Sequence, residues 1–485
     1  MSSGVTGGAS GRSFDALGPR ARRLAFATVM LAFVLDITDS TIVNTALPAI
    51  QASLHAGTAA MQWIVAGYFL SFAVLLVAGG RLGDLYGYRR MFLFGVGGFT
   101  AASLACGAAG SGEALASFRV AQGAAAAIMA PQVMALVQHL FTPVERVRKL
   151  AAFGLVGGLA AIGGPILGGL LIQADIAGLG WRVIFLVNGP IGLLALAAGW
   201  RLLPDGRSSH PLEPDPLGVF LLAAALGALL LPLIGGRERG WPWPSLAALA
   251  ASPALLRLFW RHSIVRAARR GSALIAPDLF RERLFSTGLA MTLLFGTATT
   301  GFLFVLSITL QRGLGYSPLG TALAHVPFGA GVMLGVGLIG PRALPRFGKW
   351  VLVAGAAAMA VGCAAAGGAI ASRSTWLLLF SLALAGLGMG AITGPLSPVT
   401  LARVDRGHAG VAGGTHGAVQ QIGGALGSAT IGTLFFAAVD GAAYAQGFAA
   451  ALWAIGLLLL GVAVLALRLP EPIFPDARTN DHDRG

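Results

Sequence analysis

Fourteen apolar runs, most of them about 20 residues long, follow one another along this chain, and they constrain its fold more than any other feature. A run of about 18 or more apolar residues is long enough to cross a bilayer as an α-helix. Hydrophobic residues make up 56% of the chain and charged residues only 11%, too few to cover a water-soluble globule. The sequence therefore predicts an all-α polytopic membrane protein. The predicted spans are 24–47, 61–80, 91–110, 114–137, 151–173, 183–203, 216–235, 245–262, 285–310, 319–340, 350–371, 375–398, 411–438 and 444–467.

Basic residues test this count, because cytoplasmic loops of membrane proteins are enriched in Arg and Lys. With the N-terminus in the cytoplasm, basic residues fall in the predicted inner loops, such as 81–90 and 261–283, and are sparse in most outer loops. The net charge of +14 therefore indicates topology rather than nucleic-acid binding. The eighth span is the weakest, since it contains Pro253 and Arg257. Removing it alone would reverse every later loop, so the alternative to fourteen spans is twelve plus a pair on the lipid surface.

Two carboxylates lie inside the first span, in the stretch "LDITDSTIVNTALP". Asp36 and Asp39 are three residues apart, so they share one face of a helix. At about 1.5 Å per residue from Leu24 they lie roughly 18–23 Å deep. Like charges this close in a low dielectric favour a proton held on one of the two. Our hypothesis is that Asp39 couples transport to protons and that Asp36 modulates it or meets a cationic substrate. The alternative is a solvated structural pair in an outer vestibule.

Arg119 lies inside the fourth span, where a buried charge is costly and usually functional. A carboxylate or cavity water is its expected partner, and the alternative is a side chain that reaches the nearby membrane interface. The loop after the second span, "GGRLGDLYGYRR", places Asp84 among arginines and offers glycines for a tight turn. This loop is either an ion-paired latch or a solvated segment that only sets topology. Its candidate latch residues are Gly80, Gly83, Asp84, Gly87, Arg89 and Arg90.

These segments together resemble the major facilitator superfamily, and in particular its fourteen-helix drug–proton antiporter branch. The loop matches the superfamily's cytoplasmic signature, although Leu85 and Tyr88 replace basic residues. The stretch that begins at Arg119 resembles the R-x-x-Q-G motif of the fourth helix, which adds Gln122. The first-span motif aligns with Asp39 as the family acid and adds Asn44. "GGPILGG" resembles the fifth-helix antiporter motif and implies a hinge, against the alternative of ordinary glycine packing. The hinge residues are Gly164, Pro165, Gly168 and Gly169.

The resemblance implies two six-helix bundles, at 24–203 and 285–467, that rock around a central substrate site. An inserted helix pair at 216–262 and a basic cytoplasmic loop at 263–284 would join them. We expect cytoplasmic tails at 1–23 and 470–485, a location in the cell (inner) membrane, and a monomer surrounded by lipid.

The expected function is the export of small, mostly hydrophobic or cationic compounds, antibiotics included, in exchange for protons. The alternative is proton-coupled movement of one polar metabolite by the same fold. We expect no enzymatic activity, no metal site and no cofactor besides the proton gradient, because the loops are short and no nucleotide-binding loop is present. The partners would be a small-molecule substrate and protons, with no nucleic acid. Weaker cavity candidates are Gln62, Trp63, Tyr68, Gln311, His325 and His416.

Overall fold

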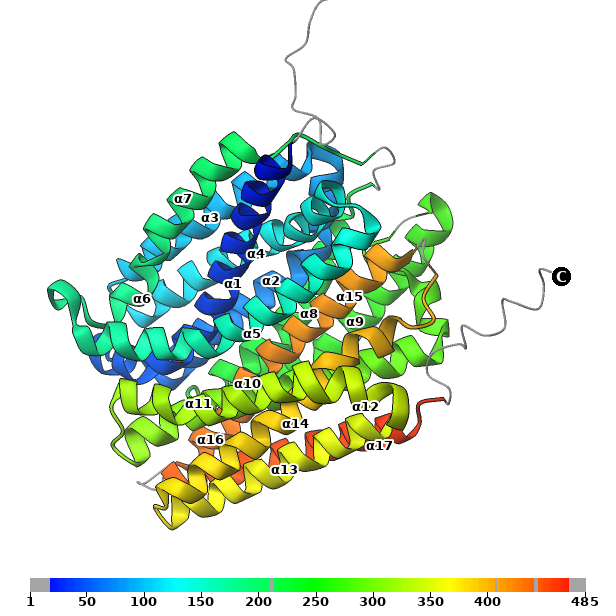
Figure 1. Cartoon of the computed structure of the whole chain (residues 1–485). Coiled ribbons are helices and arrows are strands. Elements are labelled where there is room, and N and C mark those ends of the chain that lie inside the picture. Colours follow the sequence, from blue (N-terminus) through cyan, green and yellow to red (C-terminus); the bar gives the residue numbers. More distant parts are fainter. Residues whose placement is uncertain (1–17, 209–212, 272, 406–407, 440–443, 471–485) are drawn as a thin grey trace, which may run out of the picture.

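The computed structural model describes residues 18–208, 213–271, 273–405, 408–439 and 444–470. The predicted C-terminal tail and most of the predicted N-terminal tail lie outside these ranges. Within them the chain forms helices joined by short loops, and Figure 1 shows two groups of helices lying against each other.

The first group of helices holds the N-terminal half. Two of its helices begin at capping residues, Ser111 and Thr142, and the Ser111 hydroxyl accepts a hydrogen bond from the Ala114 amide. Small residues set its packing. A Cβ at Gly79 of α2 or at Gly123 of α4 would overlap the backbone of the other helix, so the two helices approach closely. The helices of this half are α1 (Pro19–Leu54), α2 (Thr58–Tyr86), α3 (Tyr88–Gly107), α4 (Gly112–Leu140), α5 (Pro143–Ala174), α6 (Val183–Leu186) and α7 (Asn188–Leu202).

The second group holds the C-terminal half, in which α13 packs on α14 and α17, and α10 packs on α15 and α17. Short π-helical turns at Thr309–Gly313, Gly335–Ile339 and Gly427–Ile431 extend or join its helices. The helices of this half are α10 (Arg283–Ile308), α11 (Pro318–Leu334), α12 (Gly340–Phe347), α13 (Trp350–Ala371), α14 (Thr375–Leu401), α15 (Ala409–Leu426), α16 (Gly432–Ala438) and α17 (Tyr444–Leu467).

Two helices inserted between the halves, α8 (Pro216–Gly235) and α9 (Trp243–Arg270), pack along each other, and α8 also contacts α2. Asp215 anchors this pair. Its buried carboxylate caps α8 through the Gly218 amide at 2.9 Å and contacts the His262 ring at 2.9 Å. Arg266 lies 3.5 Å from the same carboxylate, so one acid holds both helices together.

Thirteen helical segments among the described residues are long and apolar enough to cross a membrane, and they match every predicted span except the eighth. The eighth corresponds to α9, whose 28 residues extend about 42 Å. Its Arg and His residues lower its apolarity, so a crossing by α9 stays a prediction. The chain is a multi-pass α-helical membrane protein.

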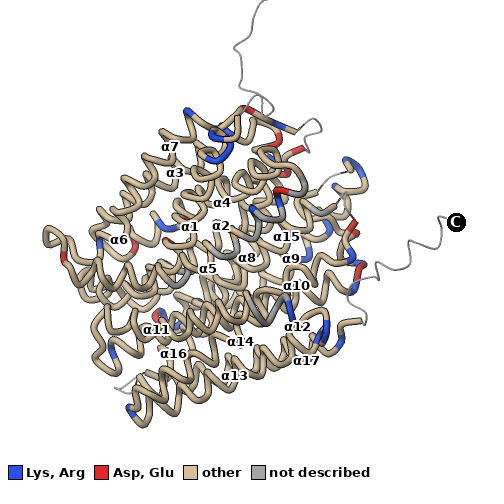
Figure 2. The backbone as a smooth tube through the Cα atoms, viewed as in Figure 1, with Lys and Arg blue, Asp and Glu red and all other residues tan. Residues whose placement is uncertain are grey.

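Charge is distributed unevenly over these helices. Figure 2 shows many of the Lys and Arg positions at the end of the bundles where α1 begins and α17 (Tyr444–Leu467) ends. We call this the basic end. It includes the turn between α2 and α3, where Gly87 adopts a φ of 99° that other residues rarely adopt.

The two halves contact each other along α5 with α11 and along α2 with α15. Away from the basic end, the two halves are joined by side chains of the π-helical turn Thr309–Gly313, which directly follows α10. Gln311 donates a hydrogen bond to the carbonyl of Thr45 at 2.9 Å, and Arg312 donates one to the carbonyl of Pro48 at 3.1 Å. These contacts, which we call the outer closure, hold α1 against the C-terminal half at the end opposite the basic end.

Candidate functional site

A buried ion pair forms the centre of the N-terminal half. Asp39 is 1% exposed and receives hydrogen bonds on both of its oxygens. Arg119 donates to Oδ2 at 2.5 Å, while Gln122 and Asn188 donate to Oδ1 at 2.9 and 2.8 Å. Three donors around one carboxylate replace the hydrogen bonds with water that burial removes. The structure thus brings together three residues that the sequence predicted and adds Asn188.

Arg119 is itself fully enclosed, at 1% exposed. Besides Asp39, it donates to the side chain of Gln122 at 2.8 Å and to the carbonyl of Ile64 at 3.1 Å. Its guanidinium carbon lies 4.3 Å from the centre of the Tyr68 ring, which is a cation–π distance. The alternative in which Arg119 reaches the membrane interface is therefore wrong.

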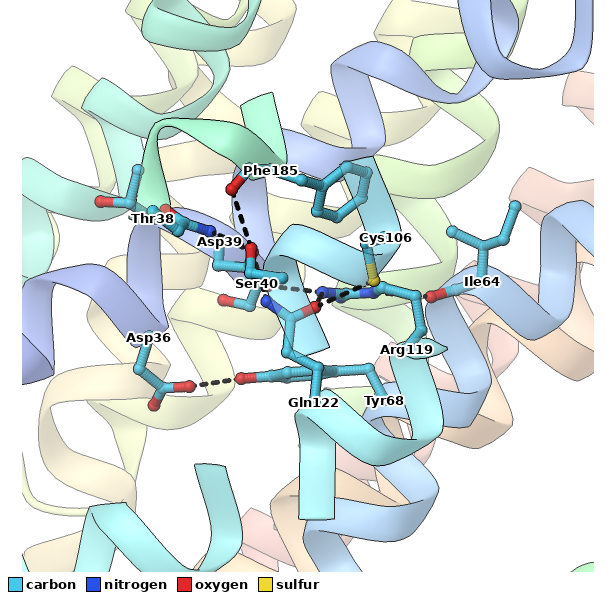
Figure 3. A network of polar contacts seen from close by, with 12 residues as sticks. Asp36, Thr38, Asp39, Ser40, Ile64, Tyr68, Cys106, Arg119, Gln122 and Phe185 are labelled. Atoms are coloured by element: carbon cyan, nitrogen blue, oxygen red, sulfur yellow. Dashed lines mark hydrogen bonds and ion pairs between the residues drawn. The ribbon is translucent and has the colours of Figure 1, made fainter. Parts of the chain in front are cut away.

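Asp36 has different surroundings from Asp39, although both lie on α1. It accepts a hydrogen bond from the hydroxyl of Tyr68, the residue whose ring faces Arg119. In Figure 3, the Tyr68 side chain extends from the buried cluster to Asp36. Tyr68 therefore connects the surroundings of the two acids. Its ring contacts Arg119, the ion-pair partner of Asp39, and its hydroxyl contacts Asp36.

A cavity of about 340 Å³ lies between the two halves, and Asp36 and Tyr68 form part of its wall. Asp39 and Arg119 are not among its lining residues. His416 and Gln420 of α15 line the opposite wall, where the sequence analysis placed His416 as a candidate. Among the described residues that line this cavity, Asp36 carries the one carboxylate. The cavity is bordered by α1, α2, α10, α14 and α15 and lies on the basic side of the outer closure.

Asn188 and Ser103 are the site residues that the sequence analysis missed. Asn188 begins α7, and its amide bridges the Asp39 carboxylate and the Ser103 hydroxyl, which it reaches at 2.9 Å. Ser103 in turn donates to the carbonyl of Phe185 at 2.9 Å. The signal in the sequence was an isolated amide in an otherwise apolar run, which is rarely placed in a membrane without a partner.

The weaker candidates separate into different places. His325 lines a second, smaller cavity, whereas Gln311 belongs to the outer closure. Asn44, which was predicted with the main site, lines both this cavity and the central one. Gln62 bonds to the Thr433 hydroxyl at 3.2 Å and so joins α2 to α16 instead of facing the central cavity. Trp63 lines a separate groove of about 580 Å³ between the N-terminal half and the inserted pair.

The predicted latch shows a different set of partners from the one that the sequence suggested. Asp84 accepts a hydrogen bond from the Tyr88 hydroxyl at 2.9 Å, and within the described part of the chain it forms no ion pair with the three neighbouring arginines. Arg89 pairs with Asp205 at 3.0 Å. Arg81 donates to the carbonyl of Glu213 at 2.8 Å, which attaches the loop to the segment before α8.

The remaining latch residues are arranged as follows. Arg90 is exposed, and Gly87, with its positive φ, ends α2. Gly83 faces Gln132 so closely that a Cβ at Gly83 would overlap the Gln132 side chain. A Cβ at Gly80 would have room, since its nearest neighbour would be Pro131 at 3.7 Å.

The predicted hinge lies where α5 meets both halves. Gly164 and Gly168 pack on α1, where a Cβ would meet Thr41 and Ile42 respectively. A Cβ at Gly169 would lie 2.9 Å from atoms of α11 in the other half. Pro165 lines the smaller cavity between them. These glycines bring α5 close to α1 in its own half and to α11 in the other half. A hinge at this position stays a prediction.

Solved structures with the same fold support this architecture. The chain aligns with a bacterial homologue of the human lysosomal transporter Spinster in an inward-facing and unoccupied conformation, at a TM-score of 0.69 and 18% identity, covering 93% of this chain and 97% of that one. It also aligns with the xylose transporter XylE from E. coli in a partially occluded inward-open conformation, at a TM-score of 0.63 and 14% identity, covering 93% and 100%.

Sequence relatives are closer. The chain is 41% identical over 425 residues to a probable actinorhodin transporter of Streptomyces coelicolor, which covers 86% of this chain and 73% of the relative. It is 34% identical to a tetracenomycin C resistance and export protein of Streptomyces glaucescens, over 84% and 74%. It is 36% identical to a puromycin resistance protein of Streptomyces alboniger, over 96% and 94%. The model of the Major Facilitator Superfamily matches residues 29–428, and the chain belongs to that superfamily.

Proposed function

We propose that this protein is a secondary active transporter that exports small, mostly hydrophobic or cationic compounds, antibiotics included, in exchange for protons. The observation that carries this proposal is Asp36, a carboxylate on the wall of the cavity between the halves. A carboxylate in that place can bind either a proton or a cationic group. Two of the relatives, a tetracenomycin C resistance and export protein and a puromycin resistance protein, support export as the direction.

The proposed orientation follows the positive charge. We place the basic end and both termini in the cytoplasm and the protein in the cell (inner) membrane. The outer closure then faces outward, and the cavity lies on its cytoplasmic side. The arrangement described here corresponds on this basis to the inward-facing state of an alternating-access cycle.

The proton step is assigned to Asp36. The sequence favoured Asp39, but its two oxygens already accept three hydrogen bonds and it is enclosed by protein. Asp36 has the Tyr68 hydroxyl as its partner and a place on the cavity wall. In the inward-facing state Asp36 releases its proton and the substrate takes its place, and in the outward-facing state a proton displaces the substrate. Because the proton and the substrate compete for the one carboxylate of Asp36, they cross the membrane in opposite directions.

The other elements have supporting roles in this proposal. Asp39 is the fixed counter-ion of Arg119, and α5 is the hinge between the halves. Asp84 exchanges its Tyr88 partner for arginines when the other state forms. The protein acts as a monomer in lipid, with the proton gradient and no cofactor as its source of energy.

Inverted membrane vesicles loaded with a fluorescent pH indicator test the proposal. After the lumen has been acidified, adding ethidium or puromycin should release protons and restore the fluorescence of the indicator in vesicles that contain the protein. Vesicles from the non-expressing strain are the control. Export that persists after the proton gradient is collapsed, or an absence of proton release with a compound that is demonstrably exported, would overturn the proposed coupling.

A further inference from the structure

A second cavity, of about 120 Å³, lies next to the main one and shares part of its wall. Thr41 and Asn44 of α1, Leu303 of α10 and Met389 of α14 line both cavities. The smaller cavity also reaches Thr45, the residue whose carbonyl accepts the hydrogen bond of Gln311 in the outer closure. It therefore forms the end of the central space that lies nearest the outer closure, with walls from both halves.

Three polar atoms on this wall are buried and have no hydrogen-bond partner. They are Oδ1 of Asn44 and the hydroxyl oxygens of Thr45 and Ser307. Thr45 and Ser307 are each 1% exposed, and they belong to opposite halves. A buried polar atom without a partner destabilises a fold, and it is uncommon in native proteins. Three such atoms around one small cavity indicate a place built for a polar group of a ligand.

Other hydroxyls on the walls of the central space behave differently. Thr41 donates to the carbonyl of Ile37 at 3.0 Å, and Thr299 donates to the carbonyl of Phe295 at 2.9 Å. Each of these hydroxyls is satisfied by its own helix, which is the usual arrangement for Thr in an apolar helix. The hydroxyls of Thr45 and Ser307 therefore differ from the other two, including that of Thr41, which lines the same cavity.

The rest of the smaller cavity defines the kind of group that fits. Nδ1 of His325 lies 2.7 Å from the carbonyl of Thr321, which can only accept, so Nδ1 donates and Nε2 is left as an acceptor. Neither a carboxylate nor an Arg or Lys is among the described residues of this lining. Apolar surface comes from residues such as Phe328 and Val332. The lining thus offers neutral acceptors and hydroxyls beside apolar walls.

The size of the cavity indicates one ring. An apolar protein cavity of roughly 150 Å³ is known to take up a benzene molecule. We propose that the smaller cavity is a specificity subsite for one uncharged, hydroxyl-bearing aromatic ring of the transported molecule. Asn44, Thr45 and Ser307 receive the ring hydroxyl, and the remainder of the substrate extends toward Asp36. This assignment rests on the proposed function, because it names the substrate class of the same central site.

The test compares two probes of matched shape, 2-naphthol and 2-methylnaphthalene, by calorimetric titration of the full chain in lipid nanodiscs, with empty nanodiscs subtracted. We expect the wild-type protein to bind 2-naphthol about three- to ten-fold more tightly than the methyl compound, as for one or two hydrogen bonds. Ser307→Ala and Thr45→Val should remove this preference and leave binding of 2-methylnaphthalene within about two-fold. Ser307→Thr should retain it.

Thr41→Val and Thr299→Val are the matched controls, because each removes a wall hydroxyl that its own helix already satisfies. They should keep the preference for 2-naphthol. An unchanged preference in the Ser307→Ala, Thr45→Val double variant would mean that these atoms serve water only, and the proposal would be wrong. Equal binding of both probes by the wild-type protein would also overturn it. The titration measures binding and needs no proton gradient. A failure of the proposed subsite can therefore be distinguished from a failure of proton exchange in the vesicle assay.

Discussion

Asp36 and Asp39 lie one helical turn apart on α1, yet Asp36 faces the cavity between the halves and Asp39 lies against Arg119 inside one half. Tyr68 separates the two environments and touches both. The two acids look equivalent in the sequence, but we assign proton coupling to Asp36 and a structural role to Asp39. Replacing each acid should therefore give a different result.

Asp36→Asn should abolish proton release on addition of substrate, because the amide cannot exchange a proton. The thermal stability of the variant should stay close to that of the wild type, since Asp36 is not part of the buried ion pair. The vesicle assay measures the first property and a melting curve of purified protein measures the second. Thr299→Val, which alters another residue that lines the same cavity, is the control. Normal proton release by Asp36→Asn would show that another group couples.

Asp39→Asn should destabilise the fold by about 3–5 kcal/mol, because it leaves the buried Arg119 without its counter-ion. A lower melting temperature and a lower yield of folded protein are the expected readouts. Adding Arg119→Gln to this variant should recover part of the loss, since the unpaired charge is then absent. An Asp39→Asn variant as stable as the wild type would contradict the role of Asp39 as a structural counter-ion.

Tyr68→Phe and Tyr68→Leu separate the hydroxyl of Tyr68 from its ring. The Phe variant loses the donor to Asp36 but keeps a ring over Arg119, so transport should fall with little loss of stability. The Leu variant also loses the cation–π contact and should be less stable by about a further 0.5–2 kcal/mol. Parallel melting curves and vesicle assays test this order. Equal stability of the two variants would show that the ring contributes nothing at Arg119.

Gly169→Ala should impair transport, because its Cβ would lie 2.9 Å from atoms of Leu319 and Ala322 in the other half. The added methyl group forces α5 and α11 apart near the outer closure. Gly163→Ala is the control on the same helix, since among the described residues no atom beyond its own helical turn lies within 4 Å of its Cβ position. We expect the control to transport normally in a growth assay with an exported antibiotic. Equal activity of the two variants would mean that α5 and α11 tolerate separation.

Asp215→Asn should lower the melting temperature at neutral pH, by the equivalent of about 1–3 kcal/mol. Burial opposes the charged form of Asp215, but hydrogen bonds from His262, Gly218 and Leu274 outweigh it and hold the pKa of Asp215 below its ordinary value. A lowered pKa means that the stabilisation is complete above about pH 4 and is lost as the pH falls further. The difference between variant and wild type should therefore shrink at about pH 3. A difference that is constant with pH would exclude the carboxylate charge as its cause.

The sequence was sufficient for the fold because long apolar runs leave a chain few alternatives in a bilayer. It was also sufficient to place Asp39, Arg119 and Gln122 in one site. The two charges are costly in an apolar span, and the resemblance to the fourth-helix motif added Gln122. It could not rank Asp36 and Asp39, because spacing places both on one helix face without showing which neighbours surround each. Tyr68 and Asn188 decide that question, and they come from other helices.

The latch shows a second limit of the sequence. Its loop places Asp84 and three arginines within a few residues, but the chain folds so that Tyr88 contacts Asp84 and Arg89 contacts Asp205. The partner of Arg89 comes from beyond α7, and nothing in the local pattern indicates it. The proposed alternation of states adds to this difficulty, because one sequence must then satisfy more than one set of contacts.

The outer closure has a consequence for how such a protein can diversify. Gln311 and Arg312 bond to main-chain carbonyls of Thr45 and Pro48, so they recognise the course of the α1 backbone rather than its side chains. The side chain of Thr45 meanwhile faces the smaller cavity. A substitution at this position can therefore alter which molecules are accepted while the seal between the halves is preserved. In the proposed mechanism, selectivity and gating are thus carried by different atoms of the same residue, which lets one evolve without the other.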